Sequence, residues 1–227
     1  MVKAVFLDFY GTLVQEDDEA IHIISKRIME TGNAEKLSDI GAYWWSSFQK
    51  LFVDSYGDTF EAQRKLEEKS LKATIEHFGS TENADELSRF MFTYWVRPAA
   101  FEESQEFLER CPVPVYIVSN IDRADIEEAI CYHRFAPEKI FTSEDARAYK
   151  PRKELFELAL QEAGLTSKEV VHIGDSLGSD IQGAGALGIK TIWINRKNKK
   201  VPEGVLAVSN LLEIFKTRHF SDGTCGG

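Results

Sequence analysis

Several polar residues of this sequence directly follow short apolar runs, and their types suit nucleophilic displacement at an anionic substrate. A carboxylate such as that of Asp8 can act as a nucleophile and form a covalent intermediate that water later hydrolyses. Taken singly, such residues are also common as helix caps and in turns. Their placement after successive runs is harder to explain by capping, and it favours a single site. The candidates are Asp8, Ser119, Asn120, Lys150, Asp175 and Asp180.

The other candidates have complementary expected roles around Asp8. Asp175 would place a second carboxylate beside Asp8, and the two groups would repel each other unless a cation lay between them. Oxygen ligands that leave room for water suit Mg²⁺. Lys150 would offset the charge of the nucleophile and of an incoming anion. The expected hydrogen-bond donors to the outer oxygens of that anion are Ser119, Asn120 and the backbone N–H groups of the Asp8–Thr12 loop, which includes Gly11 and Thr12.

Buried strands that alternate with helices are expected to position these residues. Each apolar run is short, continuous and ended by a polar residue, which is typical of a strand covered on both faces. Segments with helical periodicity lie between the runs, so the pattern predicts an α/β fold with a parallel sheet. Ligands bind outside the carboxyl ends of the strands in such a sheet. The expected strands are residues 3–8, 115–119, 170–174 and 190–194, and the expected helices are 122–133, 151–163 and 179–187.

The stretch between the first two expected strands has a different pattern. Residues 16–97 contain no convincing strand run, and glycines divide them into four amphipathic segments. We therefore expect an all-helical domain inserted into the α/β domain. Most of its aromatic residues are expected to pack in its own core. The expected helices are residues 17–30, 37–54, 59–78 and 83–96.

The composition is that of an ordinary globular protein of 227 residues, 43% of them hydrophobic. A formal net charge of −10 would repel nucleic acid and anionic membranes, so we expect neither as a partner. A local basic patch could still hold a small anion, and a small anionic substrate is the expected partner. The three cysteines, Cys111, Cys131 and Cys225, share no C-x-x-C spacing, which argues against a disulfide framework or a zinc site. With no long apolar run and no signal-peptide pattern, a cytoplasmic location is the default expectation.

Four ordered motifs resemble those of the haloacid dehalogenase-like (HAD) hydrolase superfamily. The resemblance covers nearly the whole chain. It implies a Rossmann-like core made of residues 1–14 and 98–227, with a helical cap domain made of residues 15–97. In closed form the cap would exclude water and contact the substrate, for which Tyr43, Trp45 and Lys50 are candidates. The motifs are residues 8–13 (DFYGTL), Ser119 with Asn120, Lys150 with Pro151, and residues 174–180 (GDSLGSD).

The resemblance also implies a role for each motif residue. It makes Asp8 the nucleophile, with Ser119 and Lys150 as partners of the nucleophile and of the bound anion. It makes Mg²⁺ the cofactor. The implied metal ligands are Asp8, Asp175 and the backbone carbonyl of Tyr10, with Asp180 supporting Asp175.

One motif position departs from the phosphatases of this superfamily. Most of them carry a second aspartate two residues after the nucleophile, which serves as general acid and base for the leaving group, and this chain has Tyr10 there. A phenol with an ordinary pKa near 10 is a poor proton donor to an alkoxide. The D-x-Y-G-T form resembles the 2-haloacid dehalogenases instead, in which the leaving halide needs no proton.

The fourth motif points the other way. The dehalogenases need no metal and typically replace its first acid by serine, whereas this chain keeps both Asp175 and Asp180. Residues 37–56 also lack the arginine that dehalogenases use near the halide. The main prediction is therefore a Mg²⁺-dependent phosphatase acting on a small phosphorylated metabolite with a good leaving group. The alternatives are a 2-haloacid dehalogenase-like hydrolase and a non-catalytic protein with the HAD fold.

Overall fold

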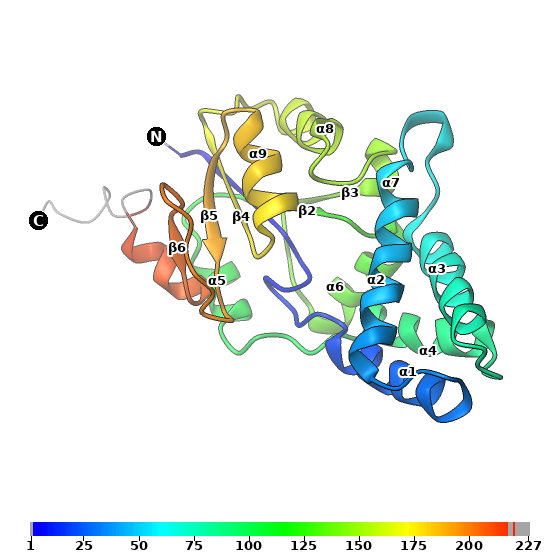
Figure 1. Ribbon diagram of the computed structural model, residues 1–227. Helices are drawn as coiled ribbons and strands as arrows, with labels where there is room; N and C mark the ends of the chain where they lie inside the picture. The colour runs from blue at the N-terminus through cyan, green and yellow to red at the C-terminus, as the bar shows by residue number, and fades with distance from the viewer. Residues whose placement is uncertain (1, 218–219, 221–227) are drawn as a thin grey trace, which may run out of the picture.

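A parallel sheet of six strands forms the centre of the computed structural model, which describes residues 2–217 and 220 (Figure 1). The spatial order of the strands is β3-β2-β1-β4-β5-β6, and each neighbouring pair is parallel. This is the Rossmann-type order, which reverses direction between β1 and β4. The strands are β1 (Ala4–Leu7), β2 (Val115–Ser119), β3 (Lys139–Thr142), β4 (Val170–Gly174), β5 (Lys190–Ile194) and β6 (Ala207–Val208).

Helices cover both faces of the sheet, as the fully apolar strands require. Side chains alternate between the faces of a strand, so Val5 and Leu7 of β1 belong to one core cluster, and Ala4 and Phe6 to another. The first cluster includes side chains of α5, α6 and the C-terminal 3₁₀ helix, and the second includes side chains of α8 and α9. The elements are α5 (Ser104–Arg110), α6 (Arg123–His133), α7 (Ser143–Ala146), α8 (Lys153–Ala163), α9 (Gly183–Ala186) and the 3₁₀ helix Leu211–Lys216.

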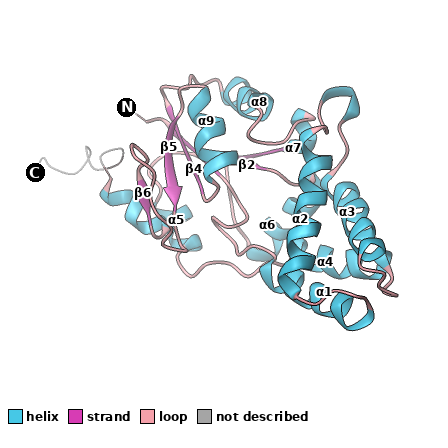
Figure 2. Cartoon of the chain, in the orientation of Figure 1, coloured by secondary structure: helices cyan, strands magenta, loops and turns pink. Residues whose placement is uncertain are grey.

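Four helices between β1 and β2 pack together beside the sheet (Figure 2). Their apolar faces meet in a shared interior that includes Ile24, Trp44, Leu71 and Met91. A buried Asp125 in α6 accepts hydrogen bonds from Arg64 of α3, which ties the helices to the α/β part. The four helices are α1 (Asp18–Thr31), α2 (Leu37–Val53), α3 (Gln63–His77) and α4 (Ala84–Val96).

The two connections between the sheet and these four helices run side by side. The Gln15 backbone N–H donates to the Ala99 carbonyl over 2.8 Å, and Phe101 N–H donates to the Leu13 carbonyl over 3.1 Å. Val14 and Ala100 form an antiparallel bridge between the same segments. The expected domain boundaries, after residues 14 and 97, fall at this crossing, and the division into two domains stays a prediction.

Several predicted elements need correction. Strands β3 and β6 were not expected, because both lie at sheet edges and are short or partly exposed. The helix expected over residues 59–78 begins only at Gln63, after a 3₁₀ turn at Gly57–Thr59. The helix expected over residues 179–187 is a π-helical turn, Leu177–Gln182, followed by α9. Helices α5 and α7 were also unexpected. Cys111 and Cys131 are free, and Cys225 lies outside the described residues.

Candidate active site

The carboxylate of Asp8 lies at the carboxyl end of β1, next to the point where the strand order reverses. It is 6% exposed. Its Oδ1 accepts a hydrogen bond from Lys150 Nζ over 2.7 Å, and its Oδ2 accepts one from Thr12 Oγ1 over 3.2 Å. The Asp8 backbone N–H donates to the Ile173 carbonyl of β4, which fixes the loop against the neighbouring strand. Asp8 is therefore held rigidly, with an oriented carboxylate.

Lys150 is a buried cation that links three elements. Its Nζ donates to Asp8 Oδ1 over 2.7 Å, to Asp180 Oδ1 over 2.6 Å and to the Val118 carbonyl over 2.9 Å. An ammonium group has three donors, so all of them are used. Burial opposes the charge, but the nearby Asp180 and Asp8 carboxylates outweigh it and raise the pKa of Lys150. Lys150 is thus a permanent counter-charge for the site.

Both carboxylate oxygens of Asp180 contact polar groups of neighbouring residues. Besides Lys150, its Oδ1 contacts His172 Nε2 at 2.9 Å, and its Oδ2 accepts from the Ser176 backbone N–H over 3.0 Å. Burial opposes ionisation, but Lys150 and the hydrogen bond from His172 hold the pKa of Asp180 well below its usual range. A side chain at Gly174 would collide with Asp180, which explains the glycine before Asp175. Asp180 therefore positions Lys150 and the turn after β4.

Asp175 presents its carboxylate toward the Asp8 loop without a hydrogen-bond donor among the described residues. The Trp193 indole N–H donates to its backbone carbonyl over 2.7 Å, which fixes the main chain only. A Cβ at Gly11, whose φ is +79°, would lie 2.5 Å from Asp175 Cγ, so only glycine allows this approach. Burial and the charges of Asp8 and Asp180 raise the pKa of Asp175 to about 8, and burial likewise raises the pKa of Asp8 to about 6.

The acidic cluster fits a divalent cation. Carboxylate oxygens of Asp8, Asp175 and Asp180 all lie within 4.8 Å of one another. Both carboxylate oxygens of Asp180 already have polar partners, and each oxygen of Asp8 accepts one hydrogen bond. No described residue donates a hydrogen bond to the carboxylate of Asp175. Asp8 and Asp175 would therefore be the side chains that hold Mg²⁺, a hard ion that prefers oxygen ligands. The Tyr10 carbonyl as a further ligand stays a prediction.

The raised pKa values of Asp8 and Asp175 predict how stability changes with pH in the absence of metal. Both groups hold protons more tightly in the folded state than in the unfolded state, where their pKa is about 3.9. Their stabilising contribution is therefore fully present below about pH 4 and is lost as the pH rises through 6 and 8. We expect the melting temperature to fall between about pH 4 and pH 8 and to level off above that, and Mg²⁺ to restore it mainly near and above pH 8.

Comparison with Asp175→Asn isolates this effect, because the variant cannot lose the proton. Allowing for solvent at the half-buried Asp175, about 2 kcal/mol of pH-dependent stability should vanish, or roughly 4–8 °C in melting temperature. Thermal denaturation of both proteins in EDTA across this pH range measures it. The buried Glu67, whose pKa burial raises to about 8, titrates equally in both proteins and cancels. Parallel melting curves for the two proteins would contradict the expectation.

Ser119 is the last residue of β2, the strand next to β1, and Asn120 follows it. Ser119 is buried. The Asn120 amide forms two hydrogen bonds with the backbone of Lys150: its Nδ2 donates to the carbonyl over 3.0 Å, and its Oδ1 accepts from the N–H over 2.7 Å. Asn120 therefore positions the loop that carries Lys150. The predicted contacts of Ser119, Asn120, Gly11 and Thr12 with an anionic substrate stay predictions.

The hydroxyl of Tyr10 has a partner in helix α4. It donates a hydrogen bond to the Trp95 carbonyl of α4 over 2.6 Å. Burial and the charges of Asp125, Asp17 and Asp8 raise the pKa of Tyr10 well above its ordinary value. A phenol in this environment gives up a proton even less readily than in water. Tyr10 thus links the loop after Asp8 to α4, and the catalytic role predicted for it from the sequence stays a prediction.

Removing this hydroxyl tests that assignment. Tyr10→Phe should leave kcat within about threefold of the wild-type value, because no proton of Tyr10 takes part in the reaction. It should lower the free energy of unfolding by about 1 kcal/mol, the usual net contribution of one hydrogen bond. Steady-state kinetics and urea denaturation check the two parts. A folded variant that turns over substrate about 100-fold more slowly would show that the phenol acts in catalysis.

Comparison with known proteins gives the family of this chain. Residues 2–188 match the family described as haloacid dehalogenase-like hydrolase. The chain belongs to that family. The (S)-2-haloacid dehalogenase of Pseudomonas sp. (strain YL) is 25% identical to this hydrolase over 95% of both chains. The crystal structure of L-2-haloacid dehalogenase from Xanthobacter autotrophicus superposes with a TM-score of 0.76 at 16% identity, covering 99% of this chain and 100% of that one.

A shorter match relates this hydrolase to a nucleotidase. The pyrimidine 5′-nucleotidase YjjG of Escherichia coli (strain K12) is 37% identical over 76 residues. That match covers 32% of this chain, which spans about a third of the nucleotidase. The full-length likeness to dehalogenases thus supports a 2-haloacid dehalogenase-like hydrolase, one of the two alternatives, better than the main prediction of a Mg²⁺-dependent phosphatase.

Among the described residues, no helix is long and apolar enough to cross a membrane.

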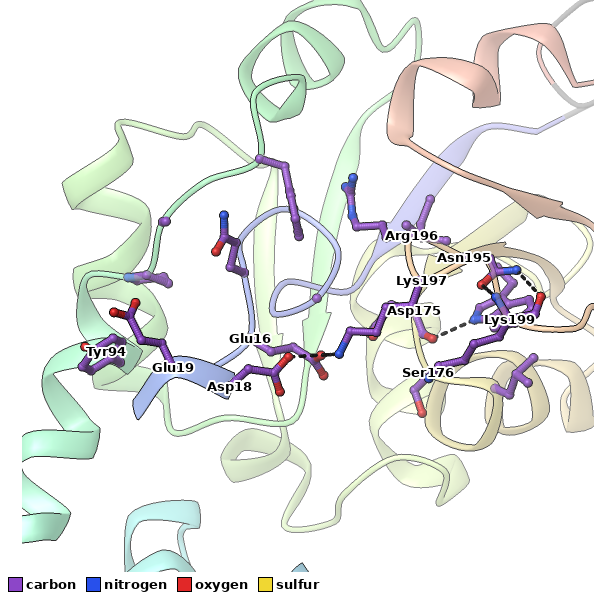
Figure 3. Close-up of a pocket in the computed structure, with 18 of the residues that line it drawn as sticks. Glu16, Asp18, Glu19, Tyr94, Asp175, Ser176, Asn195, Arg196, Lys197 and Lys199 are labelled. Atoms are coloured by element: carbon purple, nitrogen blue, oxygen red, sulfur yellow. Dashed lines mark hydrogen bonds and ion pairs between the residues drawn. The ribbon is translucent and has the colours of Figure 1, made fainter. Parts of the chain in front are cut away.

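A cavity of about 850 Å³ opens beside the acidic cluster of this hydrolase (Figure 3). Asp175 lies on its wall, and Lys197 reaches across it to Glu16 over 3.2 Å and to Asp18 over 3.0 Å. Of the predicted cap contacts, Trp45 lines the cavity, whereas Tyr43 stacks on His77 and Lys50 is exposed. A substrate role for these three residues stays a prediction.

Two residues that position the site were missed by sequence reasoning. The ring of His172 contacts Asp180, although no role was predicted for this residue. Its position in the expected strand 170–174, three residues before Asp175, could have indicated it. Arg196 donates to the Thr12 carbonyl over 2.7 Å and pairs with Glu103 at 2.7 Å. Arg196 begins the basic run of residues 196–200 (RKNKK), which is typical of a solvated loop. The sequence therefore gives no sign that its side chain turns toward the protein interior.

Proposed function

We propose that this hydrolase removes halide from small 2-haloacids through a covalent ester on Asp8. The observation that carries the proposal is the hydrogen bond from Tyr10 to the Trp95 carbonyl, which leaves no acid at the position that would protonate a leaving group. A halide departs with its bonding electron pair and needs no proton. The full-length dehalogenase relatives support the same reaction.

The chemistry follows from the groups around Asp8. Its Oδ2, which accepts only the longer hydrogen bond from Thr12, would attack the carbon that carries the halogen, forming a C–O bond as the carbon–halogen bond breaks. Lys150 keeps the nucleophile oriented and balances its charge. Water would then hydrolyse the ester, giving a 2-hydroxyacid and restoring the Asp8 carboxylate. The backbone N–H groups of the loop after Asp8 would bind the substrate carboxylate.

A second candidate is Mg²⁺-dependent phosphoryl transfer, and the pairing of Asp8 with Asp175 favours it. Two carboxylates whose oxygens lie within 4.8 Å of each other, one with its pKa raised to about 8, suit a bound cation. Mg²⁺ would neutralise charge on a phosphoryl group held at Asp8. Without a general acid at Tyr10, such an enzyme should prefer leaving groups of low pKa, such as acyl phosphates and nitrophenyl phosphate, over sugar phosphates.

One substrate panel separates these functions. (S)-2-chloropropionate, acetyl phosphate, p-nitrophenyl phosphate and a sugar phosphate would be assayed for released halide or phosphate, each with Mg²⁺ and with EDTA. Dehalogenation predicts halide release that is insensitive to EDTA. Phosphate release that requires Mg²⁺, with no halide release, would overturn the first proposal in favour of the second. Turnover of no compound would favour a non-catalytic protein.

A further inference from the structure

A second cavity, of about 170 Å³, lies inside the bundle of helices α1–α4. Three of the chain's four tryptophans, Trp44, Trp45 and Trp95, form its walls together with Phe48 and Met91. Trp45, which is 61% exposed, also lines the larger cavity beside Asp175. A ligand could therefore enter beside this indole.

Several of the polar groups that line this cavity are hydrogen-bond acceptors. Glu67 is 7% exposed, and its Oε1 has no hydrogen-bond partner within the part of the chain that the structure describes. The Oε1 of Gln63 is also buried without a partner among these residues. Asp17 accepts from the Trp95 indole N–H over 2.8 Å and keeps further acceptor capacity. Among the described lining residues there is no lysine, arginine or histidine to offset the two acids.

An unpartnered carboxylate inside an aromatic cage is costly unless a proton or a cation accompanies it. Burial and the charge of Asp17 raise the pKa of Glu67 to about 8, so its carboxyl group keeps a proton at neutral pH. A cationic group would replace that proton as the partner of Glu67. The faces of tryptophan rings attract cations, which adds a second reason for a positive ligand.

We propose that this cavity binds the primary ammonium group of a small organic amine. A primary ammonium has three N–H donors, which suits acceptors at Glu67, Gln63 and Asp17, whereas a quaternary ammonium has none. The volume equals that of about six water molecules in the liquid, which is enough for a short alkyl chain with an ammonium end. The proposal concerns binding alone and does not depend on which bond is broken at Asp8.

Titration with three small probes tests the proposal on the full chain. n-Propylammonium chloride, propan-1-ol and tetramethylammonium chloride would be compared by calorimetry and by tryptophan fluorescence, at constant ionic strength adjusted with NaCl. We expect propylammonium to bind at least about tenfold more tightly than either other probe. Equal binding of propanol, or tighter binding of tetramethylammonium, would overturn the proposal.

Matched variants locate the binding. Glu67→Gln should weaken propylammonium binding by about tenfold or more, whereas Glu68→Gln, at an exposed position on the same helix, should change it by less than twofold. Gly41 lines the cavity and a Cβ there meets no atom within 4 Å, so Gly41→Leu should fold and obstruct binding even if Glu67→Gln does not fold. Wild-type affinity in folded Glu67→Gln, or in Gly41→Leu, would overturn the assignment.

Discussion

Asp8→Asn is expected to abolish turnover of every substrate, lowering kcat by at least about 10⁴-fold, as removal of a catalytic nucleophile generally does. An amide cannot supply the electron pair that forms the covalent intermediate. The change is nearly isosteric, so Lys150 and Thr12 keep a partner at this position. Initial rates of halide and phosphate release, measured on the substrates that the wild-type protein accepts, check the expectation.

A matched control separates this effect from a general loss of negative charge. Asp58→Asn changes the same functional group on the exposed 3₁₀ turn after α2 and should keep the wild-type rate. Intact mass measurement should accompany the assay, since deamidation of the introduced asparagine would restore aspartate. A variant that stays fully amidated and retains more than about 1% of the wild-type turnover rate would show that another group attacks the substrate.

Lys150→Met is expected to lower the melting temperature by about 10 °C. The substitution leaves the carboxylates of Asp8 and Asp180 buried without their cation, and breaking such a pair typically costs about 3–5 kcal/mol. In a protein of this size, each kcal/mol corresponds to roughly 2–4 °C. Thermal denaturation at pH 7 measures the change.

Two further variants show that the loss comes from unpaired charge. Lys153→Met, three residues along on an exposed position of α8, should shift the melting temperature by less than about 2 °C. Adding Asp180→Asn to Lys150→Met should recover part of the loss, because one of the two stranded charges is then removed. A shift below about 2 °C for Lys150→Met itself would mean that the buried ion pairs contribute little to the fold.

The part of the site that follows from the sheet could be predicted from the sequence. In a parallel sheet, residues that follow strands meet at one edge, so Asp8 after β1 and Asp175 after β4 had to lie close once the strands were recognised. The strands were recognisable because burial on both faces demands continuous apolar runs, as in residues 115–119 and 170–174. The reversal of strand order between β1 and β4 then brings these two acids together.

Other features of the site and of the fold depend on tertiary contacts that have no recognisable pattern in the sequence. The hydroxyl of Tyr10 finds a partner in a backbone carbonyl 85 residues away, and any residue at position 95 offers such a carbonyl. The Asn120 amide binds the backbone of Lys150 for the same reason. The edge strand β6 pairs with a neighbour on one side only and has two residues. A strand this short has no continuous apolar run by which it could be recognised in the sequence.

The adjacent connections at Gln15 and Ala99 would allow the four helices between them to be exchanged as a unit. Both segments leave the sheet at one place and hydrogen-bond to each other there. A different bundle with its ends equally close could be joined at this point while Asp8 and Lys150 keep their places, provided that it also supplies partners for Tyr10 and Asp125. In such an arrangement, the groups around Asp8 and the helices beside the sheet could change independently in evolution.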